Sequence, residues 1–182
     1  MQSRIDLPSA NDMDPRQQAI YQSVLSTRGN ADGPFLAWLH SPGLAGPAQQ
    51  LGAFCRYDTQ LSLVESELLI LCVAAHFKCV GEQQIHEPIA IEAGLSEEVV
   101  ATLREGGVAR LRTPRLTLLQ TLARQLLGDS RIEDETFDTA QEVLGTQTLV
   151  EVVGIIGYYS FVAMTLNAFE MRLALAEPPG SR

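Results

Sequence analysis

Two acids and one histidine lie close enough in the sequence to share one site. Glu82 and His86 are four residues apart, so on a helix they occupy one face, and Glu67 lies on the preceding predicted helix. A carboxylate that bonds one imidazole nitrogen leaves the other nitrogen free to take or give a proton. A second carboxylate in apolar surroundings has a raised pKa and can act as an acid. We therefore predict acid/base chemistry in which His86 moves a proton, Glu82 orients or shares it, and Glu67 supports the pair.

A thiol lies beside this set. Cys79 falls at the predicted start of the helix that carries His86, where the helix dipole favours the thiolate. The chain has three cysteines and no CxxC pair, which favours a reducing cytoplasm over a secreted disulfide framework. We expect Cys55 and Cys72 in the core. The spacing of Cys72, His76 and Cys79 fits no common zinc motif, so we predict no metal.

Helix punctuation is clear along the chain. Asp14, Ser41 and Thr113 each precede a proline, which is typical of a capping residue followed by the first helical position. No stretch shows the alternation of a strand. The sequence therefore predicts an all-α fold, a helical bundle of about eight helices. The predicted ranges are 15–28, 42–57, 63–77, 80–93, 97–105, 114–127, 135–144 and 147–176.

Burial can be predicted for two of these helices. The segment 63–73 is apolar at nearly every position after Glu67, as in a helix at the middle of a fold. The apolar stretch 148–176 includes charged residues such as Glu151, so we interpret it as a buried helix and not a membrane span. Its small residues Gly154 and Gly157 permit close approach of a neighbour, in part another subunit.

Length and charge limit the domain organisation and the partners. The chain has 182 residues, close to one ordinary domain. We expect a flexible arm over 1–11, one helical domain over 12–176 and a flexible tail over 177–182. The formal net charge of −9 opposes binding to nucleic acid, and the start of the chain lacks the apolar core of a secretory signal.

The order of the reactive residues resembles a known family. Cys79, Glu82 and His86 are spaced as in the C-x-x-C-x-x-x-H motif of the alkyl hydroperoxide reductase D-like group, within the carboxymuconolactone decarboxylase superfamily. Glu67, twelve residues before Cys79, falls where that group has a proton-relay glutamate. Further short similarities extend the resemblance over roughly residues 34–171. They lie at 51–57, 61–71, 86–95, 157–159 and 166–170.

The resemblance implies an all-helical trimer or hexamer with sites near subunit contacts, and it implies two chemistries. Peroxidase-type members need two thiols, whereas Glu82 stands here in the second motif position and cannot form a disulfide. Decarboxylase-type members use no metal or organic cofactor and act on small lactone acids. Arg56 could hold a substrate carboxylate, because its planar fork matches two oxygens. We add Cys79, Tyr158 and Asn167 as candidate substrate contacts.

The combined prediction is a cytoplasmic decarboxylase-like lyase. It would be a homotrimer or homohexamer that binds a small molecule and neither nucleic acid nor membrane. Two alternatives stay open. One is a thiol-dependent peroxidase that uses Cys79. The other is a non-catalytic oligomeric binding protein, which would show a collapsed site without a pocket between Glu67 and His86.

Overall fold

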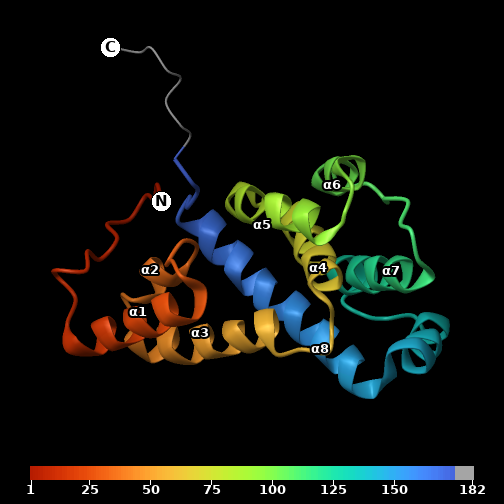
Figure 1. Cartoon of the computed structure of the whole chain (residues 1–182), viewed down its shortest axis with the longest axis horizontal. Helices are drawn as coiled ribbons and strands as arrows, with labels where there is room; N and C mark the ends of the chain where they lie inside the picture. The colour runs from red at the N-terminus through yellow and green to blue at the C-terminus, as the bar shows by residue number, and fades with distance from the viewer. Residues whose placement is uncertain (175–182) are drawn as a thin grey trace, which may run out of the picture.

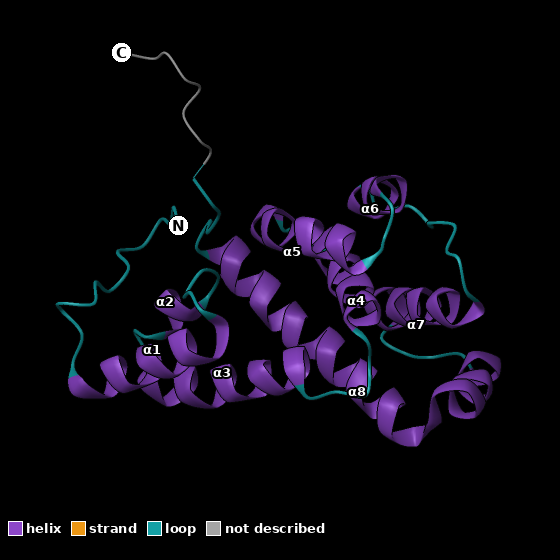
Figure 2. Cartoon of the chain, in the orientation of Figure 1, coloured by secondary structure: helices purple, strands orange, loops and turns teal. Residues whose placement is uncertain are grey.

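The fold, obtained as a computed structural model, is described for residues 1–174, and its regular elements in that range are all helices (Figures 1 and 2). Its elements are α1 (Pro15–Arg28), α2 (Phe35–Trp38), α3 (Pro42–Tyr57), α4 (Leu63–His76), α5 (Val80–Ala93), α6 (Glu97–Arg104), α7 (Pro114–Asp129) and α8 (Asp134–Ala168). Within the described range the only strand-like pairing is an isolated bridge between Gln2 and Arg172. The predicted all-α class is confirmed.

The capping residues explain where several helices begin. Asp14 accepts hydrogen bonds from the backbone N–H groups of Arg16 and Gln17, which α1 would otherwise leave unpaired. Thr113 does the same for Leu116 at the start of α7. Ser41 precedes α3 as predicted, but its side chain makes no capping bond.

The long helix α8 bends at a glycine. Gly145 has a φ of 76° and a ψ of 162°, so the helix is interrupted there, between the two ranges predicted from the sequence. The prediction that helix continues to residue 176 is wrong within the described range, because α8 ends at Ala168. Glu170 adopts a positive φ of 50°, and the N–H of Met171 turns back to the carbonyl of Leu166. Residues 175 and 176 lie outside the described part.

α4 forms the centre of the fold, as its apolar sequence predicts. Every residue from Glu65 to Ala74 is buried, and α4 packs against α5, α6, α7 and α8. Figure 1 shows α8 crossing the molecule, with α1–α3 on one side and α4–α7 on the other. Helices α1–α3 thus contact the rest of the fold largely through α8.

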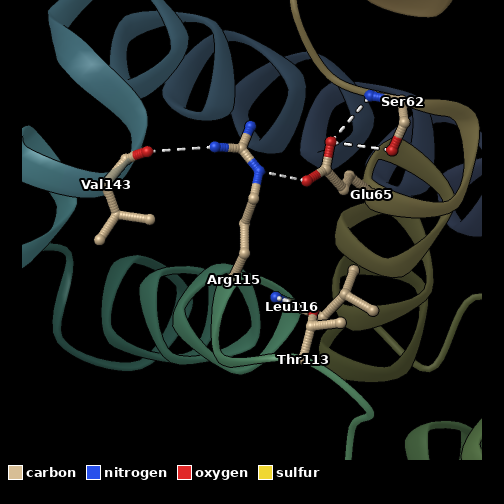
Figure 3. Close-up of polar contacts among 6 residues, drawn as sticks. All are labelled: Ser62, Glu65, Thr113, Arg115, Leu116 and Val143. Atoms are coloured by element: carbon tan, nitrogen blue, oxygen red, sulfur yellow. Dashed lines mark hydrogen bonds and ion pairs between the residues drawn. The ribbon is translucent and has the colours of Figure 1, made fainter.

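A polar cluster at the start of α4 ties three helices together (Figure 3). Glu65 accepts hydrogen bonds from the backbone N–H and the hydroxyl of Ser62, which completes the cap of α4. Arg115 of α7 donates to the same carboxylate and also to the carbonyl of Val143 in α8, at 3.2 Å. Burial would raise the pKa of Glu65, but these bonds to Ser62 and Arg115 lower it. The cluster holds α4 in register with α7 and α8.

The two ends of the described chain meet beside the C-terminal end of α8. The N–H of Gln2 donates to the carbonyl of Arg172 at 2.8 Å, and that of Arg4 donates to the carbonyl of Phe169 at 2.9 Å. The flexibility predicted for residues 1–11 stays a prediction, and the tail predicted over 177–182 lies outside the described residues. By length and composition α8 could cross a membrane, but 61% of its apolar window is buried in the fold.

Candidate active site

The hairpin of α4 and α5 brings Glu67 to His86. The chain reverses between the helices through Phe77 to Cys79, and Lys78 adopts a positive φ of 49° in this turn. Across the hairpin, Nδ1 of His86 lies 2.8 Å from Oε2 of Glu67. The predicted approach of these two side chains is confirmed by this geometry.

A guanidinium from a third helix completes the cluster. Nη1 of Arg56, near the end of α3, donates to Oε1 of Glu67 at 3.0 Å. Glu67 is fully buried, and each of its oxygens has one partner. Because this carboxylate accepts, Nδ1 of His86 carries a proton and donates it to the bond. The other ring nitrogen, Nε2, is therefore the one that can take part in proton transfer.

Glu82 has no such partner. Its side chain is 1% exposed, and neither carboxyl oxygen has a hydrogen-bond partner within residues 1–174. Burial, followed by repulsion from Glu67, raises the pKa of Glu82 well above its usual value. The environment therefore favours the protonated acid, which can donate a proton.

The predicted division of labour between the two acids is wrong. The sequence assigned the orientation of His86 to Glu82, its neighbour on the same helix face, whereas Glu67 takes that role from the facing helix. Arg56 stabilises Glu67 as an anion, and an anion is a stronger acceptor for a ring N–H than a protonated Glu82.

A pocket of about 250 Å³ lies next to this cluster. It is bounded by the end of α1, the loop that leads into α2, the end of α3, one face of α5 and the C-terminal part of α8. Its polar lining includes Arg28, Arg56, Glu82, His86, Tyr158 and Tyr159, and its apolar lining includes Phe35, Ile85, Ile89, Val162 and Leu166. The edge-on packing of His86 and Tyr159, with ring centroids 5.4 Å apart, further restricts the imidazole.

Two predicted substrate contacts do not fit this pocket. The amide of Asn167 donates to the carbonyl of Phe77 at 2.8 Å, so it supports the α4–α5 turn. Cys79 is fully buried at the start of α5 and does not line the pocket. Burial raises the pKa of Cys79 to about 11, because loss of solvation outweighs the backbone N–H groups of Gly81 and Glu82. The predicted thiolate is therefore not favoured. Arg56 and Tyr158 do line the pocket.

Two residues that shape the pocket, Arg28 and Gly52, are not among the site residues predicted from the sequence. Arg28 ends α1 and was not singled out, since a cation in the last turn of a helix usually serves the helix dipole. Gly52 of α3 is buried, and a Cβ there would lie 2.1 Å from the hydroxyl of Tyr158. No local signal distinguishes either residue. Within the described residues there is no group of three or more His, Cys, Asp or Glu placed to hold a metal ion.

Comparison with solved structures places this arrangement in a known fold. No protein-family model matches the sequence, and no curated protein matches it. An uncharacterised peroxidase-related protein of Ralstonia eutropha JMP134 with an alkylhydroperoxidase AhpD core aligns with a TM-score of 0.80 at 15% identity, over 94% of this chain and 92% of that one.

Two further solved structures are also similar to this chain. A peroxidase-related protein of Silicibacter sp. TM1040 aligns with a TM-score of 0.77 at 16% identity, over 98% of this chain and 94% of that one. The debrominase Bmp8, a cysteine-to-alanine variant in complex with 2,3,4-tribromopyrrole, aligns with a TM-score of 0.75 at 12% identity, over 96% and 93%. The resemblance drawn from Cys79, Glu82 and His86 is thus confirmed for the fold, and the chain has the fold of the AhpD core.

Proposed function

We propose that this protein is a decarboxylase-like enzyme that acts on a small carboxylated lactone, or a related acid, by acid/base chemistry without a cofactor. One observation carries the proposal. Glu82, a buried carboxyl group without a hydrogen bond to any described residue, and His86, an imidazole held by an anion, line the same pocket. Two titratable groups whose environments differ in this way are typical of a general acid and a general base.

The side chains divide the work as follows. Glu67, held by Arg56, keeps the proton of His86 on Nδ1 and fixes the orientation of the ring. Nε2 of His86 can then accept or return a proton. Glu82 is the proton donor, because burial and the neighbouring Glu67 raise its pKa and so favour the protonated form. Arg56 and Tyr158 are the remaining predicted substrate contacts on the pocket wall.

The reaction balances with these groups and one proton from solvent. The bond between the substrate carboxylate and its carbon breaks, CO₂ leaves, and the electron pair spreads onto the conjugated carbonyl as a dienolate. Glu82 gives its proton to the dienolate carbon and becomes a carboxylate. A proton from solvent, passed through His86, restores the acid. Each turnover thus consumes one proton and one carboxylate and releases one CO₂.

The pocket suits a small ring. Its volume of about 250 Å³ lies below the range of roughly 300–1,000 Å³ usual for drug-sized ligands. The debrominase with the same fold was solved with a small cyclic compound, 2,3,4-tribromopyrrole. An open pocket also favours an enzyme over a non-catalytic relative with a filled site. We place the reaction in the cytoplasm, in a homotrimer or homohexamer.

The experiment measures CO₂ release and deuterium incorporation from a panel of small lactone acids in D₂O. We expect turnover by the native chain and a loss of about 10²–10⁴-fold in the His86→Ala and Glu82→Gln variants, the usual contribution of a positioned acid or base. His76→Ala is the matched control, because His76 lies on the same hairpin but outside this pocket. Equal rates in native protein and His86→Ala, or no turnover of any lactone acid, would refute the proposal.

A further inference from the structure

The charges that line the pocket do not balance. Arg56 is paired with Glu67, and the environment of Glu82 favours its neutral form. Arg28 also lines the pocket, yet it has no carboxylate within ion-pair distance in the described part of the chain. Asp32 is the remaining acid in the lining, and it is exposed to solvent. The interior therefore carries a cation that lacks a counter-ion among the described residues.

The guanidinium of Arg28 is held by rings and not by hydrogen bonds. Its Cζ lies 4.6 Å from the ring centroid of Phe35 and 5.9 Å from that of Tyr57. Nε and Nη2 are buried and have no acceptor among residues 1–174. These two atoms form one edge of the guanidinium, the edge that matches both oxygens of a carboxylate. The side chain can turn this edge toward an anion without losing a hydrogen bond to any residue of the described range.

Gly52 allows the guanidinium of Arg28 to lie beside the hydroxyl of Tyr158. A Cβ at Gly52 would lie 2.8 Å from Nη2 of Arg28 and 2.1 Å from the hydroxyl oxygen of Tyr158. Both polar groups therefore occupy the space that a side chain at this position would fill. The missing side chain leaves two donors next to each other on the pocket wall.

We propose that Arg28, assisted by the Tyr158 hydroxyl, is the anion-binding group of this pocket and holds a carboxylate of the substrate. This inference rests on the proposed function for its substrate, but it assigns the anchoring role to Arg28, because Arg56 is already engaged by Glu67. The substrate then carries two carboxylates, and the one bound by Arg28 stays on the molecule while the other leaves as CO₂. An ion pair to the departing carboxylate would stabilise the ground state and slow the loss of CO₂.

The test measures binding, which needs no turnover. Furan-2-carboxylate and its methyl ester serve as probes in an NMR titration of the full chain. We expect the acid to bind the native protein more tightly than the ester, and Arg28→Met to lower affinity for the acid about 10- to 100-fold, because charge-assisted hydrogen bonds are lost. Arg28→Lys should restore part of the preference. Arg110→Gln is the control, since it removes the same charge from an exposed loop.

A stability readout separates an anchor from a structural arginine. In the absence of ligand we expect Arg28→Met to melt at the same temperature as the native chain or higher, since it removes buried donors without partners. A structural role predicts a lower melting temperature and unchanged selectivity. The inference is overturned if the native chain does not prefer the acid or if Arg28→Met keeps the preference. If the acid binds through Arg28 but no lactone acid is turned over, the proposed function fails alone.

Discussion

Glu82 gives the site a pH-dependent stability. Because burial and Glu67 raise the pKa of Glu82, the folded chain keeps a proton that the unfolded chain releases above about pH 4.3. Below that pH both states are protonated and the difference vanishes. As the pH rises toward the folded pKa, this group lowers stability by up to about 1.4 kcal/mol per pH unit.

The Glu82→Gln variant should therefore be stabilised, and more so at higher pH. We expect the difference in unfolding free energy between the variant and the native chain to grow from pH 5 to pH 8. Urea unfolding at a series of pH values measures it. Glu142→Gln, which alters an exposed acid, should show no such slope. A difference for Glu82→Gln that does not change with pH would mean that the carboxyl is ionised in the folded protein.

The reactivity of Cys79 distinguishes the proposed decarboxylase from the thiol-dependent peroxidase. With a pKa of about 11, only about one Cys79 side chain in a thousand carries a thiolate at pH 8. In a Cys55→Ala/Cys72→Ala background we expect slow reaction of Cys79 with a thiol reagent until urea is added. Cys79→Ser should keep the decarboxylase activity. Rapid labelling of the folded chain, or rapid reduction of peroxide that Cys79→Ser abolishes, would support the peroxidase instead.

At the residue scale the sequence predicted which residues form the cluster better than it predicted the hydrogen bonds between them. Helix spacing was enough to place Glu67 near His86 once the hairpin was assumed. The spacing could not show which acid bonds the imidazole, because the choice depends on Arg56. Arg56 lies on another helix and donates a hydrogen bond to Glu67, which favours the anionic form of that acid. Arg28 and Gly52 gain their importance only from neighbours distant in sequence, so no local pattern indicates them.

At the element scale the helix starts were the most predictable features, since caps and prolines act locally. α2 was missed because four residues, Phe35–Trp38, are too short to show a period, and its first position follows Pro34 without a capping side chain. The end of α8 was placed too late because the apolar sequence continues beyond Ala168. There the chain turns at Glu170, and the buried Met171 packs over Gly81 at the start of α5.

Gly52 offers a test of how α3 and α8 shape the pocket. We expect Gly52→Ala to displace Tyr158 of α8, since the new Cβ would overlap its hydroxyl. The overpacking should lower stability by about 1–3 kcal/mol and weaken binding of furan-2-carboxylate. Thermal unfolding and the NMR titration measure the two effects.

The control lies on the same helix. At Gly43 a new Cβ would meet only Arg16, at 3.8 Å, so Gly43→Ala should change stability by no more than about 1 kcal/mol and leave binding unchanged. Equal behaviour of the two alanine variants would show that Tyr158 moves freely and that Gly52 does not define the pocket wall.

At the scale of the whole molecule, α8 serves both the pocket and the surface. One face of it supplies Tyr158, Tyr159 and Val162 to the pocket. Other positions are exposed and apolar, with Val150 65%, Val153 46% and Met164 51% exposed. Gly154 and Gly157 lie among them, and a Cβ at either would meet no atom within 4 Å. The spacing of these positions places them along one side of the helix.

This surface gives the predicted homotrimer or homohexamer a direct test. Burying a valine between subunits stabilises an assembly by about 1.5–3 kcal/mol per side chain, so a charge there should dissociate it. We expect the native chain to scatter light as an oligomer and Val150→Glu/Val153→Glu to shift toward the monomer with the helix content intact. Val108→Glu is the matched control, because Val108 is 66% exposed in the loop between α6 and α7. A native chain that is monomeric at high concentration would contradict the predicted assembly, and the acid/base site would then have to work from one subunit.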